Sequence, residues 1–139
     1  MKISAVIPTC ECRWDAGITF HSLPNLSRKP DEVLVVIDGD KEKVEEHTLA
    51  GVPVKVIYTR HRGAAAKRNL GLSKCECENV LFADDDIEFM PDCLAQMEKC
   101  LQDDSQVGAV GAFIKNQPYS KPGWYSRFVW GINGLRKNR

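Results

Sequence analysis

Residues 32–38 read Glu-Val-Leu-Val-Val-Ile-Asp, and this stretch decides the fold class. Five consecutive apolar residues, four of them β-branched, are typical of a strand covered on both faces, as in a parallel sheet. Shorter apolar runs predict further strands on either side of it, at 2–8, 52–58, 79–83 and, interrupted by glycines, 107–114.

Helical patterns separate the predicted strands. They fall at 15–27, 41–50, 63–73 and 91–101, and a last one is compatible with 124–135. Strands that alternate with helices predict an α/β fold with a mostly parallel, Rossmann-like sheet and helices on both faces.

Length and composition agree with one folded domain. The chain has 139 residues, 43% of them hydrophobic and 27% charged, which excludes disordered and collagen-like classes. Apolar runs stay well short of the roughly 18 residues of a membrane span, and the N-terminus does not resemble a signal peptide. We therefore expect a cytoplasmic protein with an α/β domain at 1–114 and a tail at 115–139.

Charge is unevenly distributed along the chain. Residues 105–139 carry six basic residues and no acid, a charge of +6, against −6 for residues 1–104. The tail also has aromatic residues at helical spacing, including Trp124 and Phe128. Such a segment suits contact with an anionic membrane surface; the alternative is a helix that packs on the chain's own body. No nucleic-acid partner is predicted, and an oligomer stays open.

The carboxyl ends of parallel strands lie at one edge of the sheet. The residues expected to meet there are Thr9, 38–40, 60–62 and 84–86. Asp84 and Asp86, alternate residues of an extended segment, can share one ligand while Asp85 points aside. Carboxylates of this kind, together with substrate phosphates, are the usual ligands of Mg²⁺. The alternative is a solvated acidic turn.

Two further features of this edge are typical of nucleotide sites. Asp38 can accept a hydrogen bond from a ribose hydroxyl or a base N–H, although Asp38-Gly39 also occurs in ordinary turns. Residues 63–69 open a helix, whose N-terminus favours anions, and Lys67 and Arg68 add donors. The alternative for this helix is ordinary packing of an Ala-rich segment.

The motifs as a set resemble the nucleotide-sugar-binding half of family 2 glycosyltransferases, which have the GT-A fold. They are Ile7-Pro8-Thr9, Val35-Val36-Ile37-Asp38-Gly39, Gly63-xxx-Lys67-Arg68-Asn69-x-Gly71-Leu72 and Val80-Leu81-Phe82-Ala83-Asp84-Asp85-Asp86. The resemblance covers residues 2–114 and implies a metal-dependent glycosyltransferase. Its donor would be a UDP- or GDP-linked sugar, its cofactor Mg²⁺ or Mn²⁺, and its acceptor is not identified by the sequence.

The resemblance also implies roles for particular residues. Thr9 and Asp38 match positions near the base and ribose, and Arg68 matches a basic position near the nucleotide. Asp84, Asp85 and Asp86 match the DXD motif, with Asp84 near the ribose and Asp84 and Asp86 at the metal.

The chain departs from the family pattern in two places. Cys10-Glu11-Cys12 stands where an aromatic residue and Asn are common. The family also has a second half, with the acceptor surface and a catalytic base, whereas this chain has no acid after Asp104 and is expected to be truncated after the fifth strand. The alternative function is therefore a nucleotide-sugar-binding module without turnover. A nucleotidyltransferase is a weaker rival, because no Gly-rich basic loop follows the first strand.

The six cysteines are too sparse for a disulfide scaffold. A four-cysteine zinc site is not expected, because Cys10 and Cys12 follow the first strand whereas Cys75 and Cys77 precede the fourth, at opposite edges of the sheet. Reduced thiols are the expected state; the alternative is a disulfide at the amino edge, where Cys100 is expected near Cys75 and Cys77.

Overall fold

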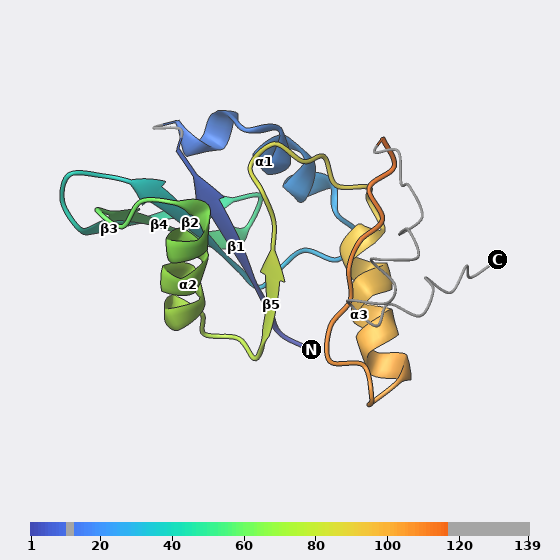
Figure 1. Cartoon of the computed structure of the whole chain (residues 1–139). Coiled ribbons are helices and arrows are strands. Elements are labelled where there is room, and N and C mark those ends of the chain that lie inside the picture. The colour runs from blue at the N-terminus through green and yellow to red at the C-terminus, as the bar shows by residue number, and fades with distance from the viewer. Residues whose placement is uncertain (11–12, 117–139) are drawn as a thin grey trace, which may run out of the picture.

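The computed structural model describes residues 1–10 and 13–116 (Figure 1). Its strands are β1 (Ile3–Thr9), β2 (Glu32–Asp38), β3 (Lys43–Leu49), β4 (Val52–Thr59) and β5 (Asn79–Phe82). Its helical segments are η1 (Trp14–Ala16), α1 (Ile18–Ser22), η2 (Leu23–Asn25), α2 (Ala64–Lys74) and α3 (Cys93–Asp103). The predicted helix at 124–135 and nearly all of the basic tail lie outside the described residues.

One five-stranded sheet organises the molecule, in the order β3-β4-β2-β1-β5. β1 lies between β2 and β5 and is parallel to both, and β2 is parallel to β4. Only β3 runs antiparallel, along the outer edge of β4. The prediction of a mostly parallel α/β sheet is confirmed.

Both faces of the sheet are covered, as the apolar run of β2 requires. Val6, Leu34, Val36 and Ile57 point to one face, where Leu70 of α2 packs on them. The opposite face of the sheet forms the larger core. Apolar side chains from β1, β2 and β4 pack there against α1, the segment after α1, and α3. The large side chains that these segments contribute are Phe20, Leu23, Leu26 and Leu94. Figure 1 shows α2 on the face opposite α1.

The helix predicted at 41–50 is wrong, because residues 43–49 form β3. Leu49 pairs with Val52, and the two residues between them, Ala50 and Gly51, both have positive φ angles of 50° and 83°. This is the backbone of a tight hairpin turn, whose twist matches that of the paired strands. Pairing with β4 therefore outweighs the local helical pattern.

The strand predicted at 107–114 is also wrong, since the structure has no strand in these residues. They run back beside α3 and β5 (orange to red in Figure 1), and Gly108, Ala109 and Val110 line a cavity there. Two glycines raise the entropic cost of an extended strand. Phe113 and Ile114 are mostly exposed, so burial does not compensate for that cost. The sheet therefore reaches five strands through β3, which the sequence did not predict, and residues 107–114 add no strand to it.

Within the described residues, no helix is long and apolar enough to cross a bilayer.

Candidate functional site

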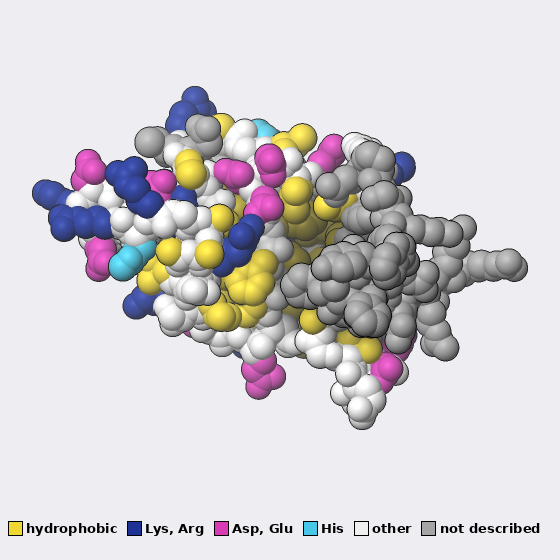
Figure 2. Space-filling view, in the orientation of Figure 1, with side chains coloured by type: hydrophobic (Ala, Val, Ile, Leu, Met, Phe, Trp, Pro, Cys, Tyr) yellow, Lys and Arg dark blue, Asp and Glu magenta, His cyan; other side chains and the backbone are white. Residues whose placement is uncertain are grey.

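The ends of β1 and β5 and the start of α2 surround a pocket of about 310 Å³ at the carboxyl edge of the sheet. Residues of all three elements line it: Pro8, Thr9, Cys10, Ala64, Lys67, Asp84, Asp85 and Asp86. Acidic and basic side chains lie close together along this upper edge in Figure 2. The fold therefore brings Thr9 and the three aspartates together, as the parallel topology predicts.

The three aspartates differ in their surroundings. Asp84 and Asp86 are exposed, and Asp84 forms an ion pair with Arg68 of α2. Asp85 is half-buried and accepts a hydrogen bond from the Thr9 hydroxyl. Asp85 thus ties the turn to β1, while its two neighbours face solvent.

The exposed aspartates fit a hard divalent cation as part of its ligand set. Carboxylate oxygens are suitable ligands, and Mg²⁺ commonly takes one or two of them together with phosphate oxygens and water. Over residues 1–10 and 13–116, no group of three or more His, Cys, Asp and Glu side chains could hold a metal by itself. A metal at Asp84 and Asp86 would therefore take its remaining ligands from a bound diphosphate and from water.

A buried threonine on α1 fixes the acidic turn from behind. Thr19 is fully buried, and its hydroxyl lies 2.7 Å from the carbonyl of Asp84 and 2.8 Å from that of Ile87. The same oxygen accepts the Ile87 N–H at 3.0 Å. Close packing adds to this, because a Cβ on Gly17 would lie 2.8 Å from the Asp85 carbonyl.

Asp38 lies at the end of β2 beside a buried lysine. Lys67 is only 2% exposed, and its ammonium lies 3.1 Å from Oδ1 of Asp38. The distance makes this contact an ion pair, but its angles do not suit a hydrogen bond. Among the described residues, Oδ1 of Asp38 is therefore buried without a hydrogen-bond partner. The Lys67 ammonium holds the pKa of Asp38 below its usual value, against the opposing effect of burial.

The remaining predicted positions are more peripheral. Arg60 donates to the carbonyl of Asp40 at 2.6 Å, which joins the ends of β4 and β2. His61 is exposed, and neither of these side chains lines the pocket. The end of β4 therefore supports the site rather than facing it.

Sequence reasoning missed Thr19 and the burial of Lys67. A threonine in a short helix has no local signal, because its partners lie 65 and 68 residues away. For Lys67, the small residues at 64–66 and Gly71 were a usable signal. They allow the helix to approach the sheet closely, and a lysine one turn into such a helix can reach the strand ends.

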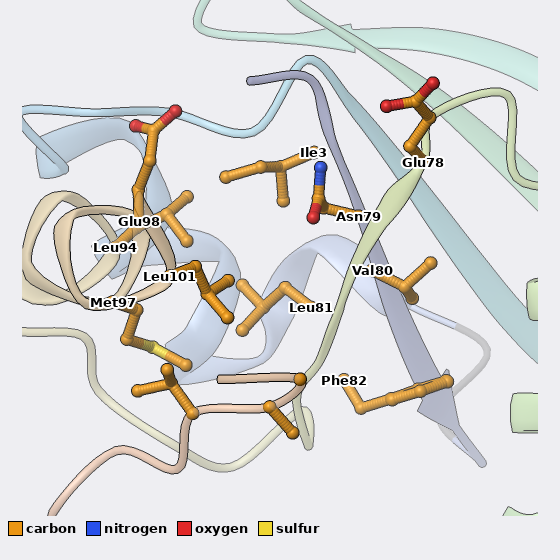
Figure 3. A pocket seen from close by; sticks show the side chains of 13 residues that line it. Ile3, Glu78, Asn79, Val80, Leu81, Phe82, Leu94, Met97, Glu98 and Leu101 are labelled. Carbon is orange, nitrogen blue, oxygen red and sulfur yellow. The ribbon is translucent and has the colours of Figure 1, made fainter. Parts of the chain in front are cut away.

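A larger cavity, of about 440 Å³, lies elsewhere, between β5, α3 and residues 108–110 (Figure 3). Its lining is mostly aliphatic, with Leu81, Leu94, Met97 and Leu101 pointing into it. Glu98, at its rim, is engaged by Arg28 and by the N-terminal ammonium. The strand-end pocket differs from this cavity, because three carboxylates and the Lys67 side chain line it.

The cysteines agree with the expected reduced state in the part of the chain that is described. Cys10, Cys75, Cys77, Cys93 and Cys100 are all free. Burial raises the pKa of the Cys75 and Cys93 thiols, which keeps them protonated. Cys10 lines the pocket, whereas Cys75 follows α2, toward the opposite edge of the sheet; Cys12 lies outside the described residues.

Comparison with known proteins gives consistent matches. A family model described as glycosyl transferase family 2 matches residues 4–139. An uncharacterized glycosyltransferase of Haemophilus influenzae is 33% identical over 101 residues, which are 72% of this chain and 33% of the relative. A dolichol-phosphate mannosyltransferase of Pyrococcus furiosus is 22% identical over 135 residues, 93% of this chain and 38% of the relative.

Solved structures of S. aureus TarS share the fold. TarS 1-349 in complex with UDP superposes with a TM-score of 0.57 at 26% identity, over 74% of this chain and 32% of that one. The complex with UDP-GlcNAc gives a TM-score of 0.54 over the same shares. The chain thus spans about a third of the length of the relatives it matches.

Proposed function

The chain belongs to glycosyltransferase family 2, and on that premise we propose that its strand-end pocket binds a nucleoside-diphosphate sugar with Mg²⁺ or Mn²⁺. The likeness to TarS confirms the GT-A-like fold class. Relatives solved with UDP and UDP-GlcNAc support a uridine-linked donor over a guanosine-linked one.

The observation that carries the proposal is the meeting of four predicted groups at one edge. These groups come from β1, β2, α2 and the turn after β5, and they are Thr9, Asp38, Arg68 and the aspartates 84–86. Thr9 contacts Asp85, and Arg68 contacts Asp84. Lys67 joins Asp38 to the carbonyl of Thr9. Asp38 offers acceptor oxygens to a nucleoside, and Arg68 offers donors to phosphate. A bound metal would act as a Lewis acid that offsets charge on the departing diphosphate.

Titration calorimetry of the 139-residue chain with UDP and with GDP, each with and without Mn²⁺, tests the proposal. We expect UDP to bind tightly only with the metal. The double variant Asp84→Ala/Asp86→Ala should lose binding, whereas Asp15→Ala/Asp103→Ala, which removes two exposed acids away from the pocket, should keep it. Equal binding by the two double variants would refute the site.

Transfer of the sugar is a second part of the proposal, and the alternative is a binding module without turnover. Inverting transfer needs a base within hydrogen-bond reach of the acceptor hydroxyl, and losing one costs roughly 10²–10⁴ in rate. Besides the aspartates assigned to donor and metal, Asp40 and Glu88 are exposed acids near this edge. We expect this chain to hold donor but transfer it slowly.

Acceptor screening with a labelled donor decides between transfer and binding alone. Slow release of free sugar without a glycosylated product favours the binding module. Rapid transfer to an acceptor would show that the base lies within this chain, and Asp40→Asn and Glu88→Gln would then identify it.

A further inference from the structure

Lys67 is the most deeply buried ionisable side chain among the residues that the structure describes, at 2% exposed. It lies on the first turn of α2, and its ammonium contacts three groups. It donates to the carbonyl of Thr9 at 2.8 Å, lies 3.3 Å from Sγ of Cys10 and lies 3.1 Å from Oδ1 of Asp38. All three partners stand at the carboxyl ends of β1 and β2.

Burying an ammonium group between a helix and a sheet costs desolvation free energy. Desolvation offsets most of the attraction within a buried ion pair, and apolar residues of similar volume often give equal or greater stability. The charge of Lys67 therefore calls for a reason other than stability, and its partners indicate one.

The geometry holds the Asp38 carboxylate from its buried side. Oδ1 is buried against Lys67, yet the side chain as a whole is 26% exposed. The exposed surface of Asp38 therefore lies on atoms other than Oδ1. A carboxylate held in this way has little freedom left to lose on binding.

We infer that Lys67 is a positioning residue for the nucleoside. It holds the Asp38 carboxylate in place at the end of β2 through Oδ1. This inference rests on the proposed function. The resemblance to the family assigns Arg68 to the nucleotide, not Lys67.

Two neighbouring residues of α2, Lys67 and Arg68, contact different sides of the pocket. Lys67 contacts the ends of β1 and β2, whereas Arg68 pairs with Asp84 after β5. A small rotation or shift of α2 would change both sets of contacts. In this proposal, Lys67 positions the groups on the nucleoside side of the pocket, and Arg68 positions those on the phosphate side.

A double-mutant cycle on the full chain tests the inference, with UDP and Mn²⁺ as the probe. Loss of a charged hydrogen-bonding partner typically weakens binding about 10- to 100-fold, and we expect a loss of that size for Lys67→Met and for Asp38→Asn. The double variant should bind no more weakly than Asp38→Asn alone, because Lys67 acts through Asp38. Lys74→Met, an exposed lysine of the same helix, should bind like the unmodified chain. Additive losses would overturn the inference.

A second readout does not need nucleotide. Carboxyl NMR titration should find the pKa of Asp38 below its usual value, and Lys67→Arg should keep it lower than Lys67→Met does. The titratable and charged groups that face Asp38 are Lys67, Cys10 and Arg62, so Arg62→Gln measures the background contribution. If Asp38 titrates normally in the unmodified chain, the inference fails even where Lys67→Met does not fold.

The two readouts separate the proposals. If the unmodified chain binds neither UDP nor GDP with Mn²⁺, the proposed function fails, whereas the titration still decides the Lys67–Asp38 contact. If nucleotide binds and Lys67→Met leaves both its affinity and the Asp38 titration unchanged, only the inference fails.

Discussion

A single hydroxyl group holds the acidic turn in register with the rest of the site. Thr19 satisfies the Ile87 N–H and one of two nearby carbonyls, and it does so where water has no access. Buried donors and acceptors that lose their partner cost about 1–3 kcal/mol each. The position of Asp84 and Asp86 therefore depends on a residue that does not itself line the pocket.

We predict that Thr19→Val, which keeps the shape and removes the hydroxyl, lowers the free energy of unfolding by about 1–3 kcal/mol and weakens binding of UDP with Mn²⁺. Thr19→Ser keeps the hydroxyl and should retain most of the affinity. Urea denaturation and calorimetry measure the two effects. Unchanged stability and affinity in Thr19→Val would contradict the assigned role.

Glu32 performs a similar task at the opposite edge of the sheet. It is buried at the start of β2, and its carboxylate accepts from the Ser4 hydroxyl at 2.5 Å and from the Glu76 N–H at 2.7 Å. Lys55 lies 3.5 Å away. Burial alone would raise the pKa of Glu32, but these three partners outweigh it and leave the pKa below its usual value.

This lowered pKa predicts a dependence of stability on pH. The ionised form is stabilised by folding, so its contribution is complete above the usual glutamate pKa of roughly 4.3 and is lost as pH falls through the lower folded pKa. Glu32→Gln should therefore destabilise the chain at pH 7, and the difference should shrink below about pH 4. Denaturant unfolding at several pH values measures this, with the exposed Glu46→Gln as control. A difference that is constant with pH would contradict the assignment.

The sequence predicted the carboxylates of the site but not what holds them. Asp38 and Asp84–Asp86 directly follow apolar runs, and parallel topology alone brings strand ends together. Thr19, Lys67 and Glu32 act through partners that are distant in the sequence and become neighbours only in the folded chain. Local patterns carry no information on such contacts.

At the scale of elements, the position of α2 against the sheet rests on one glycine. A Cβ on Gly71 would lie 2.4 Å from Cγ1 of Val6, on β1, an inner strand of the sheet. Valine is β-branched and has little freedom to move aside. Only glycine allows the helix to come close enough for Lys67 to reach the strand ends.

Gly71→Ala should therefore destabilise the chain, although alanine favours a helix by about 1 kcal/mol. Overpacking of this kind typically costs about 1–3 kcal/mol. Gly108→Ala is the matched control, because nothing lies within 4 Å of its Cβ position. Thermal unfolding measures both, and Val6→Ala added to Gly71→Ala should recover part of the loss. A stabilised Gly71→Ala would contradict this packing.

The two wrongly predicted elements share a physical cause. Residues 41–50 are polar and locally compatible with a helix, and the turn at Ala50-Gly51 lacks the Asn-Gly or Asp-Gly signal of a tight hairpin. Residues 107–114 have an apolar run and lie beside β5, but they form no strand. Strand formation depends on a partner, and a partner is a property of the fold rather than of the segment.

At the scale of the whole molecule, charge is distributed unevenly between the two ends of the chain. The basic residues after residue 104 balance the acidic body, and the sequence predicts attraction to anionic surfaces. Each basic residue near such a surface contributes about 1 kcal/mol, and the attraction falls off within a Debye length.

We therefore predict that the tail governs binding to phosphatidylserine vesicles. Replacing Arg127, Arg136, Lys137 and Arg139 with Gln in the full chain should abolish most co-sedimentation. The same change at four exposed lysines of the body, Lys2, Lys41, Lys74 and Lys99, should have little effect. Neutral vesicles and high salt are the controls, and identical partitioning of the two variants would contradict the prediction.

The inner place of β1, between β2 and β5, has a consequence for how the protein is made. β1 emerges from the ribosome before the other strands of the sheet, yet its pairing partner on one side, β5, begins 76 residues later, at Asn79 opposite Ile3. At about 5–20 residues per second, that edge stays open for roughly 4–15 s. Open apolar strand edges promote aggregation. Slower synthesis would therefore prolong the exposure of this edge rather than relieve it.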